Sequence, residues 1–290
     1  MKLGELLRNG IADLLEAGVV EYEVDAMLLL QHCSGKSRTE IYLSGNTEAS
    51  LELKQEYYSL LCRRKLREPV AYIVGEREFW SLPFHVNQDV LIPRPETEFL
   101  LDRVFALTDA QNFVRGNILD LCCGSGVICT VLAIETGKRV VASDISGSAL
   151  QVARLNTASH RMDHLVRFVQ GNLLNCFPLR SDFSLVVSNP PYVSNREISE
   201  DLAPEVVQYE PHLALDGGDH GMEIIEQIRE DLPGVLMPGG QCFIEIGAAQ
   251  GREVLELFRD SISGCPDFQY VEILKDYAGR DRVLHARLTK

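Results

Sequence analysis

The sequence is poor in three features that would each define a class of protein: paired cysteines, basic residues and long apolar runs. Its eight cysteines are Cys33, Cys62, Cys122, Cys123, Cys129, Cys176, Cys242 and Cys265. None of them forms a Cys-x-x-Cys pair, which argues against a zinc site and against a disulfide framework. We therefore expect reduced thiols that pack as small apolar side chains, and no bound metal.

The net charge and the hydropathy pattern argue against two further classes of protein, those that bind nucleic acid and those that span a membrane. Asp and Glu number 42 against 28 Lys and Arg, so the formal net charge is −14. Such a chain lacks the clustered cations that bind a phosphate backbone tightly, so we expect no direct contact with nucleic acid. Residues 1–20 carry charges throughout, and no apolar run approaches the roughly 18 residues of a membrane span. We expect a cytoplasmic monomer that does not bind membranes.

The chain divides into three parts by its patterns. In residues 1–75 apolar side chains recur at the i, i+3 and i+4 spacing of amphipathic helices, without interruption by strand-like alternation. Residues 76–95 combine short β-type runs with an Asn-Gln-Asp turn and prolines, which favours a hairpin. Residues 96–290 alternate between strand-like and helix-like segments. We predict a small helical domain, a β-hairpin connector and a larger α/β domain.

The alternation in the third part indicates βαβ units. Strand-like runs occupy 118–121, 140–142, 166–169, 185–187 and 242–246, with helical patterns at 146–159 and 221–232. Such an order is typical of a doubly wound, mostly parallel sheet of the Rossmann-like type, with helices on both faces. Residues 268–276 and 281–288 read as two further strands, an antiparallel pair at the sheet edge.

Three strand ends carry groups suited to a nucleotide. Asp120 ends the first strand and is followed by Gly124-Ser125-Gly126, where glycines allow a tight turn and close approach to a ligand. Cys129 stands where a dinucleotide fingerprint has its third glycine, which disfavours NAD. Asp144 ends the second strand and can accept hydrogen bonds from ribose hydroxyls. Asn172, after the third strand, offers an amide to an adenine ring.

The fourth strand ends in Asn189-Pro190-Pro191-Tyr192, a combination that an ordinary loop does not need. The amide oxygen of Asn189 and the carbonyl of Pro190 can each accept one N–H of a planar amide or amino group. Such a nitrogen is a poor nucleophile because its lone pair is delocalised, as the peptide rotation barrier of about 18–20 kcal/mol shows. Two acceptors can hold it in a reactive geometry, while the prolines stiffen the loop and Tyr192 lies against the flat group.

Each of these residues also has a structural interpretation. Asp144 could belong to a helix N-terminus, Asn172 could form a turn, and the Asn-Pro-Pro-Tyr stretch could be a rigid turn with Tyr192 in the core. A ligand site is favoured because all of these groups follow strands of one parallel sheet, whose carboxyl edge is where ligands bind.

Longer motifs resemble one family of enzymes. "REPVAYIVGEREFW", "VLIPRPETE", "YEPHLALDGGDHG" and "DYAGRDRV" occur in this order, together with the glycine turn, Asp144 and Asn-Pro-Pro-Tyr. The set is similar to class I S-adenosylmethionine-dependent methyltransferases of the release-factor glutamine methyltransferase family. The resemblance implies methyl transfer to the side-chain amide nitrogen (N5) of the glutamine in the Gly-Gly-Gln loop of peptide chain release factors. It also implies a helical N-terminal domain joined by a hairpin to the methyltransferase domain.

The resemblance assigns roles to particular residues. Substrate binding falls to Asn189, Pro190, Pro191 and Tyr192, of which Asn189, Pro190 and Tyr192 are expected to be catalytic. Contacts with S-adenosylmethionine, which leaves as S-adenosylhomocysteine, are expected from Cys122, Cys123, Gly124, Ser125, Gly126, Asp144, Asn172, Leu173 and Asn189. The sequence departs from the family at Cys122, where glycine is usual, and at Asn172-Leu173, where Ser-Asp and an aromatic residue are common.

Two other functions remain open on the sequence. Asn-Pro-Pro-Tyr suits the amino nitrogens of adenine or cytosine equally well, although the chain shows no target-recognition domain and no basic groove. A cofactor-binding module without catalysis is the third, non-enzymatic alternative, which the intact Asn189 motif argues against. Pro238-Gly239-Gly240-Gln241 spells the substrate motif within the chain itself. We interpret it as the turn before the fifth strand.

Overall fold

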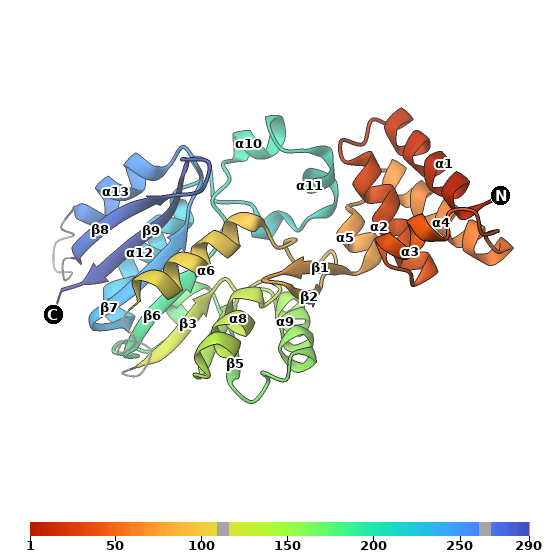
Figure 1. Ribbon diagram of the computed structural model, residues 1–290. Helices are drawn as coiled ribbons and strands as arrows, with labels where there is room; N and C mark the ends of the chain where they lie inside the picture. Colours follow the sequence, from red (N-terminus) through yellow and green to blue (C-terminus); the bar gives the residue numbers. More distant parts are fainter. Residues whose placement is uncertain (109–115, 261–267, 290) are drawn as a thin grey trace. The chain divides into compact units, whose positions relative to one another are not determined.

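The computed structural model describes residues 1–108, 116–260 and 268–289, and within them the chain forms two compact units. The first unit comprises Met1–Glu76 together with Ala203–Tyr209, and the second comprises Arg77–Leu202 and Glu210–Lys290. Figure 1 labels the helices and strands of both units and colours them by their position in the sequence. The short insertion from the second half of the sequence into the first unit is not visible in the sequence pattern.

The first unit is a cluster of helices. They are α1 (Leu3–Glu16), α2 (Tyr22–Ser34), α3 (Arg38–Leu43), α4 (Leu51–Lys65), α5 (Val70–Val74) and α11 (Pro204–Tyr209). Gly35 ends α2 in the left-handed conformation with φ of 63°, which a glycine adopts without strain. Tyr57 of α4 is fully buried, donates to the carbonyl of Ala26 at 3.0 Å, and packs where Gly10 of α1 leaves room.

An ion-pair network joins α11 to α4 inside this unit. Arg64 donates to Asp25 at 2.7 Å and to Glu205 at 3.1 Å, and Arg67 reaches the same oxygen of Glu205 at 3.2 Å. Asp25 and Arg64 are both buried. Burial raises the pKa of Asp25, and the hydrogen bond and charge of Arg64 oppose that rise.

The second unit contains a two-stranded hairpin and a seven-stranded sheet. The hairpin strands are β1 (Glu76–Phe79) and β2 (Leu82–His85). The sheet strands are β3 (Asn117–Leu121), β4 (Val140–Asp144), β5 (Val166–Gln170), β6 (Phe183–Ser188), β7 (Leu236–Glu245), β8 (Phe268–Lys275) and β9 (Asp281–Leu288). Their order is β5-β4-β3-β6-β7-β9-β8, and β9 pairs antiparallel with both of its neighbours while the other pairs are parallel. The predicted parallel sheet with an antiparallel edge pair is confirmed.

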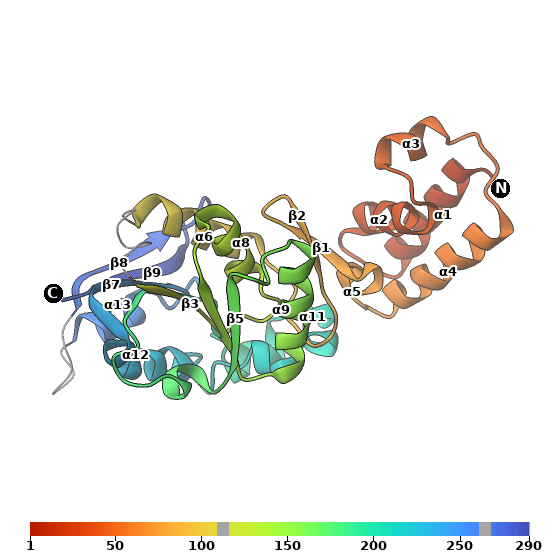
Figure 2. The same cartoon turned by 90° about the horizontal axis from the view of Figure 1, so that it is seen from below.

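Helices cover both faces of the sheet, and Figure 2 shows α6 and α8 on one side and α12 on the other. The helices of this unit are α6 (Pro95–Leu107), α8 (Val127–Thr136), α9 (Gly147–Ser159), α10 (Asn195–Glu200), α12 (Glu223–Val235) and α13 (Gly251–Arg259), with short turns η1 (Leu173–Cys176) and η2 (His212–Ala214). Along β6, Leu185 and Val187 pack toward α6, α8 and α9, while Val186 packs toward α12 and α13. β6 therefore separates two apolar cores.

The hairpin packs onto the first of these cores. Phe79 and Phe84 face each other across β1 and β2 with ring centroids 6.0 Å apart, and both are buried in the core that contains α6. The turn residues Trp80 and Ser81 have positive φ of 55° and 57°. Such a turn matches the twist of a two-residue hairpin loop.

The fifth strand of the parallel set begins earlier than expected. β7 starts at Leu236 and contains Pro238-Gly239-Gly240-Gln241, so the prediction of a turn before the strand is wrong. Between the pairs Phe183–Leu236 and Leu185–Gln241 the register shifts, so the motif forms a bulge within β7. Pro238 lacks a donor for the sheet and Gly239 has φ of 78°, which explains why the extra residues are expelled here.

Two further findings concern the described part of the chain. Its cysteines are all free thiols, and Cys265 lies outside it. None of its helices has the length and apolar character required to cross a membrane.

Candidate active site

A cavity lies at the carboxyl edge of the parallel strands in the second unit. The chain runs from β3 outward through β4 and β5, then returns to place β6 on the other side of β3. This reversal of strand order leaves a crevice between the segments that follow β3 and β6. The Ser188 hydroxyl at the end of β6 donates to the carbonyl of Leu121 at 2.8 Å and fixes the two segments together. The cavity measures about 390 Å³, within the range of small-molecule sites.

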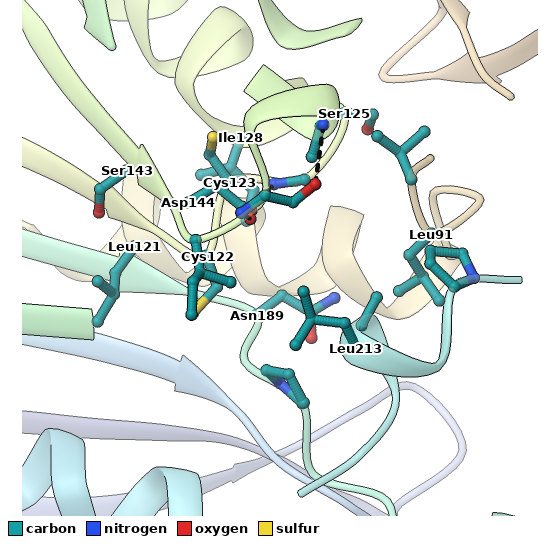
Figure 3. A pocket seen from close by; sticks show the side chains of 18 of the residues that line it. Leu91, Leu121, Cys122, Cys123, Ser125, Ile128, Ser143, Asp144, Asn189 and Leu213 are labelled. Atoms are coloured by element: carbon teal, nitrogen blue, oxygen red, sulfur yellow. Dashed lines mark hydrogen bonds between the residues drawn. The ribbon is translucent and has the colours of Figure 1, made fainter. Parts of the chain in front are cut away.

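Most of the predicted residues meet in this cavity, as Figure 3 shows for Cys122, Asp144 and Asn189. Those that line it are Cys122, Cys123, Gly124, Ser125, Asp144, Asn172, Leu173, Asn189 and Pro191. Three predicted residues do not line it: Gly126, Pro190 and Tyr192. The four strand ends singled out in the sequence therefore face one space.

The turn after β3 is built from residues in the left-handed conformation. Cys122, Gly124 and Gly126 have φ of 60°, 51° and 78°. A Cβ on Gly124 would meet no protein atom within 4 Å, so this glycine leaves open space at the cavity wall. A Cβ on Gly126 would instead come within 2.8 Å of the side chain of Ala153, so Gly126 serves the close packing of α8 on α9.

Asp144 holds the same turn from β4. Its Oδ2 accepts from the backbone N–H of Gly124 at 2.8 Å, and its Oδ1 accepts from Ser146 at 2.9 Å. Ser146 is the N-cap of α9, so Asp144 stands just before the helix and does not cap it. Burial raises the pKa of Asp144, and the backbone hydrogen bonds oppose that rise. Each carboxylate oxygen keeps a lone pair for a further donor, such as a ribose hydroxyl.

The segment after β5 contributes an apolar side chain and an amide. Leu173 is buried and has φ of 48°, a strained value for a leucine, and it lines the cavity. Asn172 is exposed beside it and stands before η1 without capping it through its side chain. An apolar wall next to a polar amide at the cavity rim fits the flat face and the edge of an adenine ring.

The Asn-Pro-Pro-Tyr segment leaves β6 and splits between the cavity and the core. Asn189 and Pro191 line the cavity, whereas Pro190 is buried. Tyr192 packs against the core that contains α12, and its hydroxyl donates to Oε1 of Glu245 at 3.0 Å. The ring of Tyr192 thus packs against the core, as expected for a rigid turn, whereas Asn189 at the start of the motif lines the cavity.

Loops that no strand-end argument predicted complete the cavity. Leu91 and Arg94 from the segment before α6 line it, as does Leu213 of η2. Glu210, whose side chain is 1% exposed, ties these two segments together: it accepts from the N–H of Ile92 at 3.3 Å and from the Arg94 guanidinium. Burial raises the pKa of Glu210, and the charge of Arg94 lowers it.

Thr97 and Glu245 are further residues that the sequence analysis missed. Thr97 lines the cavity, and Glu245 lies behind it, fully buried at the end of β7. Burial raises the pKa of Glu245 to about 7. The sequence does contain a signal for Glu245, which is an acidic residue inside the apolar run "CFIEI". An unpaired buried acid is rare and costly, so such a residue is expected to have a specific partner.

The described residues bring together no set of three or more His, Cys, Asp or Glu side chains that could hold a metal ion. His160, which stands four residues before His164, instead donates from Nε2 to the carbonyl of Pro83 at 2.8 Å and packs against Phe84. These contacts connect the end of α9 to the hairpin.

Comparison with known proteins agrees with this geometry. Residues 96–226 match the family model described as "Methyltransferase small domain", and residues 5–75 match "PrmC N-terminal domain". The solved structure of the hMettl16 catalytic domain in complex with MAT2A 3'UTR hairpin 1 has the same fold, with a TM-score of 0.53 and 16% identity over 79% of this chain and 80% of that one. Fold and site therefore define a class I methyltransferase.

Full-length relatives narrow the class to one family. The release factor glutamine methyltransferase of Cereibacter sphaeroides is 37% identical over 99% of both chains. That of Yersinia pestis is 40% identical over 89% of this chain and 90% of its own. The chain belongs to the release factor glutamine methyltransferase family, an S-adenosylmethionine-dependent enzyme family, as the resemblance of its motifs predicts.

Proposed function

We propose that the protein transfers a methyl group from S-adenosylmethionine to the side-chain amide nitrogen of the glutamine in the Gly-Gly-Gln motif of peptide chain release factors. The observation that carries the proposal is that one cavity contains both halves of the site. Gly124 and Asp144 form one wall, and Asn189 and Pro191 form another. The names of full-length relatives supply the substrate.

The residues present fit the cofactor. The open space in front of Gly124 admits a ligand close to the backbone, and Asp144 retains acceptor capacity for two ribose hydroxyls. Binding is assigned to Cys122, Cys123, Gly124, Ser125, Asp144, Asn172, Leu173 and Asn189, with Gly126 acting through the packing of α8. When bound, S-adenosylmethionine supplies a methyl group on a positively charged sulfur. The negative charge of Asp144 favours such a cation in the cavity.

The catalytic role of this chain is to position the substrate nitrogen. Asn189 Oδ1 and the carbonyl of Pro190 accept the two N–H groups of the glutamine amide and favour a pyramidal nitrogen. Among the described residues none donates to the Pro190 carbonyl, which leaves it for the substrate. Positioning of this kind is worth roughly 7–11 kcal/mol. The glutamine nitrogen gains the methyl group and releases one proton to water, so no general base is needed.

Pro191 and Tyr192 shape the slot in different ways. Pro191 lines the cavity directly. Tyr192 acts from behind, since its hydroxyl is bound by Glu245 and its carbonyl accepts from the Gln250 amide at 2.9 Å. Both ends of the tyrosine are thus held, and the loop that carries Asn189 is rigid before any substrate arrives.

The partner is a protein that itself binds RNA, and the acidic chain suits that partner without competing for the RNA. We propose that it acts as a monomer in the cytoplasm, with the helical unit in substrate recognition and no direct contact with nucleic acid or membranes.

The test is to incubate the protein with a release factor and labelled cofactor, then sequence the Gly-Gly-Gln peptide by mass spectrometry. We expect one methyl group on the glutamine and none on a release factor whose glutamine is replaced by alanine. An unmodified glutamine under conditions in which the cofactor binds would refute the proposal. DNA and RNA in the same assay test the amino methylation of adenine or cytosine.

A further inference from the structure

A buried carboxylate joins the two ends of the Asn-Pro-Pro-Tyr segment. Glu245 Oε1 accepts from the Tyr192 hydroxyl at 3.0 Å, and Oε2 accepts from the Thr97 hydroxyl at 2.8 Å. Thr97 in turn lies 3.0 Å from the amide nitrogen of Asn189. Glu245 and Thr97 are 0% and 2% exposed. The four side chains form one chain of hydrogen bonds from the cavity wall into the core.

The order of donors in this chain has only one consistent solution when Glu245 is ionised. A carboxylate can only accept, so both hydroxyls must donate to it. Thr97 has a single hydroxyl proton, and once this is committed to Glu245 its oxygen can only accept from Asn189. The NH2 group of Asn189 must therefore face Thr97, and its oxygen must face the other way.

That orientation matters for the proposed reaction, on which this inference rests. An asparagine amide is nearly symmetric in shape, so its torsion alone does not choose which end meets the substrate. If the NH2 group of Asn189 faced the cavity, it would meet the NH2 group of the substrate glutamine, and two donors cannot form a hydrogen bond with each other. We propose that Glu245 and Thr97 are positioning residues that hold Asn189 with its oxygen toward the substrate nitrogen.

The network has a built-in dependence on pH. Burial raises the pKa of Glu245 to about 7, with Arg282 on β9 lowering it and Glu96 on α6 raising it; Thr97 and Tyr192 are the hydroxyls that face it. Once protonated, Glu245 can donate to Thr97, and Thr97 can then turn its own proton toward Asn189. Both orientations of the Asn189 amide are then possible, and only one of them is active. Turnover should fall as the pH drops through about 7, since the active form is the carboxylate.

The first test compares variants of Thr97 in the full-length protein with an intact release factor as substrate. Thr97→Val keeps the shape but cannot accept from Asn189, so we expect kcat to fall about 10- to 100-fold. Cofactor affinity, measured by calorimetry, should stay within about twofold of the parent, because Thr97 acts on the substrate side. Thr97→Ser restores the hydroxyl and should recover most of the rate. Thr108→Val, a buried threonine at the other end of α6, is the matched control and should leave kcat unchanged.

The second test uses Glu245→Gln and the pH profile of kcat. The parent should show an acid limb with an apparent pKa near 7, and this limb should be absent in the variant, which is uniformly slower. The prediction stands even if Thr97→Val proves unstable, because Glu245→Gln preserves size. Equal turnover by Thr97→Val and the parent, or an unchanged acid limb in Glu245→Gln, would overturn the inference alone. A parent that binds cofactor but leaves the glutamine unmodified would overturn the proposed function and the inference together.

Discussion

The backbone N–H of Gly124 donates to Oδ2 of Asp144 at 2.8 Å, which locks the turn after β3 to the end of β4. The carboxylate thus has two tasks. It holds a glycine turn in the conformation that borders the cavity, and it presents its remaining lone pairs to a ligand. A residue with both tasks affects cofactor binding more than one that only borders the site.

Asp144→Asn should weaken the binding of S-adenosylmethionine by about 10- to 100-fold, since hydrogen bonds to a charged group contribute roughly 1.5–3 kcal/mol. Isothermal calorimetry on the purified protein measures the effect. Asp89→Asn, an exposed acid that also lines the cavity, serves as the control and should change the affinity little. Equal losses in both variants would mean that Asp144 contributes only to the general negative potential.

Asn189→Ala should abolish most of the turnover and lower cofactor affinity far less, because Asn189 is one of several residues assigned to cofactor binding. The variant removes one preorganised acceptor, for which a loss of about 100- to 1,000-fold in kcat is expected. Single-turnover methylation of a release factor measures the rate. Asn195→Ala, an exposed asparagine that is bonded to Asp219 and does not line the cavity, should behave as the parent does. Full activity of Asn189→Ala would remove the basis for the proposed positioning of the substrate.

The sheet and the cavity edge were predictable from the sequence because both depend on local patterns. Apolar runs such as 185–187 separated by helical segments imply parallel strands, and parallel strands bring their carboxyl ends to one edge. Asp144 is the last residue of β4, Asn189 directly follows β6, and Gly124 lies in the turn after β3. Their meeting in one cavity is a consequence of topology alone.

Residues that act across the fold could not be predicted in this way. Thr97 and Glu245 are 148 positions apart, and although Thr97 lies within "VLIPRPETE", that motif does not indicate a partner on β7. Their pairing depends on how α6 packs over β7, which is a matter of three-dimensional packing. The same holds for Tyr192: its ring was expected against the substrate, and only the structure shows that its hydroxyl is bound to Glu245.

In the helical unit, Arg64→Met should lower the free energy of unfolding by about 3 kcal/mol. The change removes the cation from a buried pair and leaves Asp25 without its partner. Arg63→Met is the matched control, because Arg63 is 42% exposed in its pair with Glu68 and such pairs contribute less than about 1 kcal/mol. Urea unfolding monitored by circular dichroism measures both. Similar losses in the two variants would show that the packing of the arginine stems matters more than the buried charge.

Cys122 offers a test of backbone strain, since this non-glycine residue has φ of 60° in the turn after β3. Cys122→Gly and Cys122→Ala both remove the thiol and differ only in the Cβ. We expect the alanine variant to be less stable than the glycine variant by about 0.5–1 kcal/mol, because a Cβ is disfavoured in the left-handed region and only part of that cost is offset by the flexibility of unfolded glycine. Thermal unfolding measures the difference. A more stable alanine variant would contradict the strain at this turn.

Asp120 should make stability depend on pH. Its Oδ2 accepts from the N–H of Cys129 at 2.8 Å, while Oδ1 is buried without a partner among the described residues. Burial raises the pKa to about 8, the Cys129 hydrogen bonds oppose the rise, and the nearby Asp144 charge adds to it. An unfolded aspartate titrates near 3.9, so the folded protein binds the proton more tightly. Its contribution to stability is therefore complete below about pH 4 and is lost as the pH rises through about 8.

The comparison of the parent with Asp120→Asn isolates this contribution, because the variant has no titrating group at the site. We expect the free energy of unfolding of the parent, relative to the variant, to decrease between about pH 5 and about pH 8.5. Asp260→Asn, at the exposed end of α13, controls for the general effect of removing one negative charge. A difference between parent and Asp120→Asn that stays constant across this range would show that Asp120 is already ionised in the folded protein. In that case its charge must be stabilised by the glycine turn more strongly than the single hydrogen bond from Cys129 accounts for.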